Sequence, residues 1–229
     1  MNKAASQANQ KDLKYLVNCG NKIDERLSIF GEAPIHKAVL SGESETKKEA
    51  LGAIVQECHA DVNNIDANGW SPLHHACYIG DLGSTKFLIE NGAKVNAFSN
   101  KNRTPLHFAA MNDHVEVVKE LIGHQAEIEW QDENKCTPLH LACKKGSFNA
   151  AQLLLMSGAN VYALDERNWS SLHYAAYNGH PRVCNQLLKW EADNDILREI
   201  RTTQGKLAFN YCKDADCKKA FERKYFCQS

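Results

Sequence analysis

Apolar residues between positions 114 and 122 (HVEVVKELI) lie three and four residues apart, which is the spacing of one buried face of an α-helix. A shorter helical stretch, TPLHLACKKG, occupies 137–146 and ends at a glycine. Polar stretches separate such pairs of helices: DANG at 66–69, SNKN at 99–102, DENK at 132–135 and DERN at 165–168. The pattern predicts short and longer helices in alternation, joined by polar turns.

The chain repeats itself at a fixed period. A motif of four residues recurs as APIH, SPLH, TPLH, TPLH and SSLH, with its histidines at 36, 74, 107, 140 and 173. Three successive steps between these histidines are 33 residues and the first is 38. The unit is therefore a structural repeat of constant size, with one insertion.

Each residue type in the motif has a local physical reason. The hydroxyl of Thr137 and its counterparts can cap the first helix, and the proline that follows lacks an N–H that would be unpaired there. Gly146 is expected to end this helix in a left-handed conformation, and Asp113 replaces the glycine in the third copy. After the second helix, the stop is Gly92 or Gly158 in two copies and a residue with a Cβ in the others: His59, Gln125 and Glu191.

A period of 33 residues with a TPLH-like motif resembles the ankyrin repeat, and the resemblance covers roughly residues 10–226. It implies an all-α solenoid of stacked helix-turn-helix units with projecting hairpin loops, forming a single domain over 1–229. In this interpretation Asn210 takes the histidine position of a degenerate last unit. The expected boundaries are an N-terminal cap at 1–29, repeats at 30–66, 67–99, 100–132, 133–165 and 166–201, and a C-terminal cap at 202–229.

Two insertions interrupt the period. Five extra residues fall at 43–52, where Thr46 and Glu49 have the spacing of a capping box, so we expect a longer connection followed by a re-entered second helix. About four more residues fall within 193–204, before the C-terminal cap.

His140 and Cys143 lie three residues apart, as a nucleophile and its base or half of a metal site would. The recurrence of the histidine in five units favours a structural role instead, and the family implies hydrogen bonds within and between repeats. Ala110 and Ala176 fill the cysteine position in sister units, so the site requires only a small side chain. We expect no metal, no cofactor and no catalysis, since the chain also lacks the phosphate-binding and hydrolase motifs.

Composition narrows the class of protein further. The net charge of −1 argues against broad electrostatic binding to nucleic acid or membranes. No apolar run is long enough to span a membrane, and the N-terminus lacks the apolar core of a secretory signal. Nine cysteines without a dense framework suit reduced thiols. We therefore expect a cytoplasmic protein, with a nuclear or cytoskeletal location as alternatives.

A partner must be specified by the positions that differ between repeats, because the shared positions build the stack. These lie at the hairpin tips and before the glycine of the first helix, and in the family both sets line a concave groove. They carry five basic and two acidic residues, and include aromatic and arginine side chains of the kind enriched at protein interfaces. The candidate partner-binding residues are Trp70, Tyr78, Lys101, Arg103, Met111, Lys144, Lys145, Arg167, Trp169 and Tyr177.

Sequence reasoning thus predicts a protein–protein interaction module, monomeric on its own, that acts as an adaptor, scaffold or assembly subunit. The expected partner is another protein with an acidic or aromatic-accepting segment; nucleic acid is disfavoured, because only a small cluster of basic residues supports it. The alternatives are a permanent structural component of a large complex, for example a cytoskeletal one, and an inhibitor of a partner enzyme. The aromatic residues could instead only pack against their neighbours.

Overall fold

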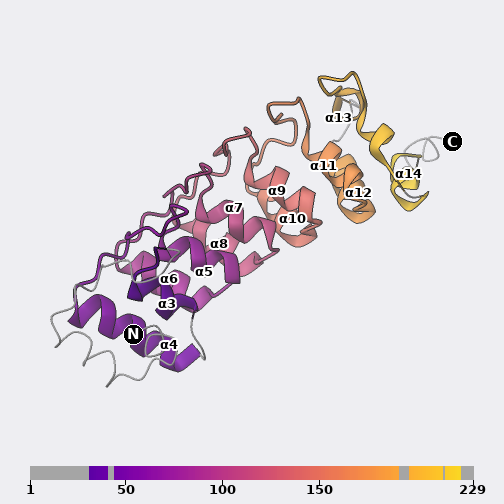
Figure 1. Ribbon diagram of the computed structural model, residues 1–229. Helices are drawn as coiled ribbons and strands as arrows, with labels where there is room; N and C mark the ends of the chain where they lie inside the picture. Colours follow the sequence, from indigo (N-terminus) through magenta and orange to yellow (C-terminus); the bar gives the residue numbers. More distant parts are fainter. Residues whose placement is uncertain (1–30, 41–43, 191–195, 214, 223–229) are drawn as a thin grey trace. The chain divides into compact units, whose positions relative to one another are not determined.

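The computed structural model describes residues 31–40, 44–190, 196–213 and 215–222 (Figure 1). In these residues the chain forms helices and turns, and its only β-pairing is an isolated bridge between Arg201 and Leu207. The described residues fall into two compact units, 31–105 with 123–126 and 106–122 with 127–222. Each unit is considered by itself below.

Unit 1 consists of two helix pairs. The first pair is α3 (Pro34–Leu40) with α4 (Ser44–Gly52) and the π-helical stretch η1 (Ala53–Glu57), and the second is α5 (Pro72–Ile79) with α6 (Leu82–Glu90). α3 packs against α5, and α4 packs against α6. The largest fully buried side chains of this core are Ile35, Leu51, Ile54, Leu73 and Leu88.

Unit 2 continues the alternation of short and longer helices. In chain order it contains α7 (Pro105–Met111), α8 (Val115–Gly123), α9 (Pro138–Lys145), α10 (Phe148–Met156), α11 (Ser171–Tyr177), α12 (Pro181–Trp190), α13 (Ile196–Glu199), the 3₁₀ turn η2 (Ala208–Tyr211) and α14 (Ala215–Glu222). The end residues Pro105 and Gly123 of α7 and α8 belong to unit 1. α9 packs against α10 and α11, and α12 packs against α10, α11 and α14, so short helices form one layer and longer helices another (Figure 1). The leucines at the centre are fully buried: Leu106, Leu121, Leu139, Leu154, Leu155 and Leu172.

The motif histidines link successive repeats through hydrogen bonds. The backbone N–H of Ser71 donates to Nδ1 of His74 at 3.0 Å, so the proton of this imidazole must be on Nε2. Nε2 then donates to the carbonyl oxygen of Arg103, in the next repeat, at 3.0 Å. The same bonds recur at His140 and His173, and all of these side chains are fully buried. The structural interpretation of the histidines is confirmed.

The helix ends adopt the expected left-handed conformation. Gly80, Gly146 and Gly179 have φ values of 78°, 77° and 71°, and Asp113 has a φ of 58° in the equivalent place. After the second helices, His59 and Gln125 adopt φ values of 54° and 62° although they carry a Cβ. The remaining residue of this set, Glu191, lies outside the described residues.

The expectation for the first insertion is wrong in one respect. α4 already begins at Ser44, and the helix continues through Glu57 by switching to π-helical bonds, with Cys58 N–H donating to the Ala53 carbonyl at 3.1 Å. α4 has nine residues, as α6 has, and η1 adds five. Since Leu51 and Ile54 are both buried, the extra residues keep apolar side chains in the core, which outweighs the local capping-box signal. Residues 41–43 lie outside the description.

The C-terminal unit departs from the motif as expected. Oδ1 of Asn210 accepts the backbone N–H of Leu207 at 2.8 Å, which is the role of Nδ1 in the histidines. α14 presents Cys217, Ala220 and Phe221 to the core, and leaves Lys218, Lys219 and Glu222 exposed. The described part of the second insertion contains α13, anchored by the buried Leu197. Arg223, Lys224 and the expected helix at 11–20 lie outside the described residues.

Candidate functional site

A hollow of 220 Å³ lies in unit 2 where α9, α11 and the turn before α11 meet. Four of the residues that line it are candidate partner-binding residues from the sequence: Lys144, Arg167, Trp169 and Tyr177. Asn178 lines it as well. The sixth is Tyr174, which sequence reasoning missed. We call this the α9–α11 hollow.

The turn that carries Arg167 and Trp169 is fixed by one buried carboxylate. Oδ1 of Asp165 accepts the backbone N–H groups of Arg167 and Trp169, both at 2.8 Å. Asn168 completes the turn with a φ of 56°. Asp165 is only 3% exposed, so the carboxylate is an internal support and adds little negative charge to the surface.

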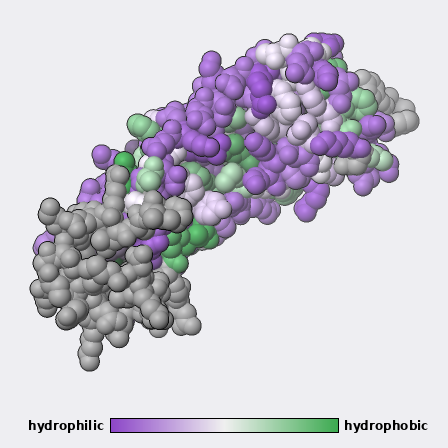
Figure 2. All heavy atoms as spheres, in the orientation of Figure 1, coloured by the Kyte–Doolittle hydropathy of each residue, from purple (hydrophilic) through white to green (hydrophobic). Residues whose placement is uncertain are grey.

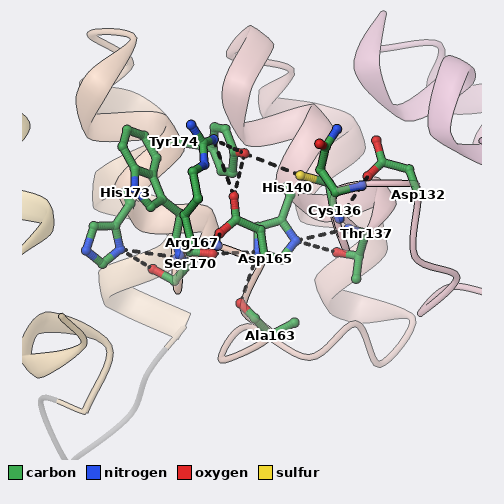
Figure 3. A network of polar contacts seen from close by, with 12 residues as sticks. Asp132, Cys136, Thr137, His140, Ala163, Asp165, Arg167, Ser170, His173 and Tyr174 are labelled. Carbon is green, nitrogen blue, oxygen red and sulfur yellow. Dashed lines mark hydrogen bonds and ion pairs between the residues drawn. The ribbon is translucent and has the colours of Figure 1, made fainter. Parts of the chain in front are cut away.

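The second oxygen of this carboxylate holds the side chains of the hollow (Figure 3). The Tyr174 hydroxyl donates to Oδ2 of Asp165 at 2.8 Å, and Arg167 Nη2 donates to the same hydroxyl at 2.9 Å. Because this hydroxyl has one proton, the thiol of Cys136, 3.3 Å away, must be a donor to it. Burial, together with Cys136 and Asp165, raises the pKa of Tyr174, so it remains a neutral phenol. The network fixes Arg167 while 53% of its side chain stays exposed.

Aromatic rings and cations alternate around the hollow. The Trp169 ring centroid lies 5.2 Å from that of Tyr174, 5.4 Å from that of Tyr177 and 4.8 Å from that of Tyr211. Arg167 Cζ lies 4.9 Å from the centroid of Trp169, and Lys144 Nζ lies 5.6 Å from that of Tyr174. Two more lysines approach the rim, with Lys213 Nζ 4.3 Å from the Tyr177 ring and Lys206 Nζ 5.7 Å from the Tyr211 ring. The hollow therefore offers flat apolar walls together with positive charge.

Unit 1 contains the same arrangement 99 residues earlier. Oδ1 of Asp66 accepts the backbone N–H groups of Asn68 and Trp70 at 2.8 Å, and its Oδ2 lies 3.1 Å from Nε2 of His75. The Trp70 ring centroid is 5.0 Å from His75 and 5.5 Å from Tyr78. Burial lowers the pKa of His75 despite the adjacent carboxylate, so the pair is a hydrogen bond rather than an ion pair at neutral pH.

The two arrangements differ in charge. Six residues before the motif histidine, unit 1 has Asn68 where unit 2 has Arg167. Four residues after the motif histidine of the preceding repeat, unit 1 has Leu40, which is 42% exposed, where unit 2 has Lys144. At these two positions the first surface is therefore uncharged and the second is cationic.

The other candidate residues are dispersed. Lys101 is exposed on the turn of unit 1 that follows α6, and Arg103 beside it is half-buried, with its carbonyl bound to His74. Met111 is half-buried, and its carbonyl accepts the Ser147 hydroxyl at 2.8 Å. Lys145 is exposed at the end of α9 but does not line the hollow.

A signal for Tyr174 was present in the sequence. The residue that follows the motif histidine differs in each copy, as the partner-binding positions do: Lys37, His75, Phe108, Leu141 and Tyr174. A position directly after the repeated histidine is expected to belong to the core, and both His75 and Tyr174 are in fact buried.

The cysteines of the first helices behave as packing residues. Cys77 and Cys143 are fully buried, and burial raises both pKa values, that of Cys143 to about 12. A thiol with so high a pKa is neither a nucleophile nor a ready metal ligand at neutral pH. Within the described ranges, no group of three His, Cys, Asp or Glu side chains is arranged to hold a metal ion, and no helix is long and apolar enough to cross a bilayer.

A repeat of paired helices with a histidine link, left-handed stops and buried turn carboxylates defines the class of the protein. The sequence profile described as ankyrin repeats, in three copies, matches residues 1–99, 47–132 and 106–198. The chain belongs to the ankyrin-repeat family, and its fold is the all-α ankyrin solenoid.

Particular relatives are similar over different lengths. The crystal structure of the human ASB11 ankyrin repeat domain superposes with a TM-score of 0.82 at 26% identity, covering 97% of this chain and 96% of that one. Mouse Rabankyrin-5 is 47% identical over 49 residues, which are 21% of this chain and 4% of that protein. Mouse protein phosphatase 1 regulatory subunit 27 is 39% identical over 67 residues, or 29% of this chain and 40% of that protein. The chain thus matches less than half the length of either of these two relatives.

Proposed function

We propose that the chain is a non-catalytic adaptor, scaffold or assembly subunit that binds another protein through the surface formed by its turns and first helices. The α9–α11 hollow is the observation that carries this proposal. Its aromatic walls are partly exposed, with Tyr177 at 44%, and Arg167 is held in place by the Tyr174 hydroxyl. Exposed aromatic and arginine side chains on a rigid support are typical of binding hot spots.

The charge of the hollow favours an acidic segment of the partner. Lys144 and Arg167 line it, Lys206 and Lys213 flank it, and the carboxylate of Asp165 beneath it is already engaged by four donors. A glutamate or aspartate side chain could therefore contact the guanidinium of Arg167 while its neighbours pack on Trp169. The surface of unit 1 around Trp70 and Tyr78, which has Asn68 and Leu40 at the positions of Arg167 and Lys144, would suit an apolar residue.

The proposal is tested with the full chain immobilised in an extract of its native cells. Proteins retained by the wild type are compared by quantitative mass spectrometry with those retained by Lys144→Glu and by Lys119→Glu, an exposed lysine of α8 with the same charge change. At least one protein should be retained by the wild type and Lys119→Glu but lost with Lys144→Glu. If both variants retain the same proteins as the wild type, the hollow is not the binding surface.

The second candidate function is regulation of an enzyme. The similarity to a phosphatase regulatory subunit favours it, although it extends over only 29% of this chain. If the partner identified above is an enzyme, adding the wild-type chain should change its rate, and Lys144→Glu should not. An unchanged rate with intact binding would assign the scaffold role.

We also place the protein in a reducing compartment such as the cytoplasm. The support for this is that the described cysteines, Cys58, Cys77, Cys136, Cys143, Cys184, Cys212 and Cys217, are all free thiols.

A further inference from the structure

A second pocket of unit 2 is lined by residues of α10 and α12. Figure 1 shows these two longer helices side by side. The volume of the pocket is 360 Å³, which falls within the range of small-ligand sites. It shares no residue with the α9–α11 hollow, so the inference below does not depend on the proposed function. The side chains that matter are Phe148, Arg182, Gln186, Lys189 and Trp190.

Gln186 lines this pocket with an amide that lacks partners. Both Oε1 and Nε2 are buried, and neither atom finds a hydrogen-bond partner among the described residues. Burial of an unpaired amide is unfavourable, and the equivalent positions of the earlier helices show that the fold does not require it: they hold Phe87, Glu120 and Leu153. An amide retained at such a cost indicates a group that binds it from outside.

The rest of the pocket shows what kind of group this is. Arg182 Cζ lies 4.7 Å from the Phe148 ring centroid, which leaves the hydrogen-bonding edge of the guanidinium available, and Lys189 is an exposed second cation. No carboxylate lines the pocket in the described residues. Trp190, 43% exposed, adds an apolar wall. The site therefore combines positive charge and an aromatic surface with amide groups. Gln152 and Asn185 also line it, and Gln186 supplies an amide donor and acceptor without partners among the described residues.

We propose that this pocket binds the C-terminal residue of another polypeptide, one with an apolar side chain. Both amide atoms of Gln186 are buried, so the side chain would turn toward the pocket on binding. The terminal carboxylate would then accept from Gln186 Nε2 and Arg182, and the backbone N–H of the same residue would donate to Gln186 Oε1. The apolar side chain would lie against Trp190. A chain terminus supplies all three groups within one residue, whereas an internal acidic residue has a carboxylate but no apolar side chain.

The test uses the ¹⁵N-labelled full chain and the peptide Ac-Gly-Ser-Gly-Ser-Leu as the free acid. Titration should move the side-chain NH₂ signals of Gln186 and the indole N–H signal of Trp190 to saturation, and leave the indole signal of Trp169 in place. The C-terminal carboxamide of the same peptide should bind about tenfold more weakly, since the charge-assisted hydrogen bonds are lost. Equal binding of acid and amide would overturn the proposal. So would equal binding of the amidated peptide Ac-Gly-Ser-Asp-Ser-Leu, which would indicate an internal acidic residue.

Substitution by the residue of the sister helix separates a binding role from a structural one. Gln186→Leu copies Leu153, and it should raise the urea midpoint while abolishing the response to the free acid. Gln204→Leu, on an exposed turn of unit 2, is the matched control and should retain the response. A lower midpoint with unchanged peptide binding would show that Gln186 is structural and refute the proposal.

Two further variants test the outcomes that Gln186→Leu leaves open. If Gln186→Leu does not fold, the exposed Arg182→Gln should weaken free-acid binding about tenfold, and an unchanged affinity refutes the site. The triple variant Glu191→Gln, Asp193→Asn, Asp195→Asn tests occupancy by the chain itself, since these residues lie outside the described ranges. A movement of the Gln186 signals in this variant without peptide would assign the pocket to the chain's own acidic side chains and overturn the proposal.

Discussion

His140 offers a direct measure of how much one histidine link contributes to stability. Its Nδ1 accepts the backbone N–H of Thr137 at 3.1 Å. Its Nε2 lies 3.0 Å from the Ala163 carbonyl, within the same repeat, and 3.2 Å from the Trp169 carbonyl in the next repeat. Alanine at this position leaves the N–H of Thr137, a residue only 1% exposed, without an acceptor.

The chain itself suggests a variant that separates the contribution of the Nδ1 hydrogen bond from that of the Nε2 hydrogen bonds. Asn210 performs the intra-repeat role at η2, where its Oδ1 accepts the N–H of Leu207. His140→Asn should therefore preserve the helix cap and lose only the hydrogen bonds of Nε2, including the link to the next repeat, at a cost of about 1 kcal/mol. His140→Ala loses both and orphans a buried donor, so its cost should be about 3 kcal/mol.

The free energies of unfolding are obtained from urea titrations followed by circular dichroism, with the slopes compared to confirm that the same surface is exposed in each variant. The expected order is wild type, His140→Asn, His140→Ala, with the larger gap between the two variants. Equal losses for asparagine and alanine would refute the reasoning, because the intra-repeat bond would then contribute nothing.

Three further predictions follow from buried groups and backbone geometry. Burial lowers the pKa of His74 from 6.5 to about 4, so the unfolded chain binds a proton first as the pH falls, and this group should reduce stability by up to about 3 kcal/mol between pH 6.5 and 4. His74→Asn should therefore flatten the profile of urea midpoint against pH. Gly146→Ala should reduce the free energy of unfolding by about 1 kcal/mol more than Gly158→Ala does, because both glycines have a positive φ but only at Gly146 would a Cβ meet a side chain, at 2.7 Å from His180 Nδ1. Equal losses in thermal unfolding would contradict this steric argument. Tyr174→Phe should lower the free energy of unfolding by about 1–3 kcal/mol and weaken binding of the partner, because Arg167 and Asp165 lose the hydroxyl between them. Tyr211→Phe should change neither stability nor binding, and equal effects of the two substitutions would argue against the network.

Much of the fold could be predicted because its signals are local. The hydroxyl, proline and glycine of the motif act within one short helix, and their recurrence every 33 residues identified the family. The first insertion was predicted wrongly, since the helix start suggested by Thr46 and Glu49 competes with core contacts of Leu51 and Ile54 that no local pattern reveals.

The site was predictable only in part for the same reason. Four of the six residues of the α9–α11 hollow stand at positions that vary between repeats, and this variation identified them. Tyr174 acquires its role from Asp165, nine residues earlier, and from Cys136, thirty-eight residues earlier. Such a relation is fixed by how repeats pack on each other, and it cannot be derived from spacing within one of them.

The surface of each unit can change without disturbing its interior. On the face shown in Figure 2, hydrophobic side chains appear only in small patches among hydrophilic ones. This division requires that side chains at the turns be exchangeable while the turns themselves stay in place.

The buried aspartates show, at the level of single atoms, how the side chains of a turn can change while its backbone stays in place. In both Asp66 and Asp165, Oδ1 accepts two backbone N–H groups, and any residue type except proline provides these. Oδ2 instead meets whichever side chain follows the motif histidine, His75 in one unit and Tyr174 in the other. One oxygen of the carboxylate thus preserves the architecture, and the other accommodates evolutionary change in specificity, so a new partner can be acquired through substitutions that leave the loop's backbone where it was.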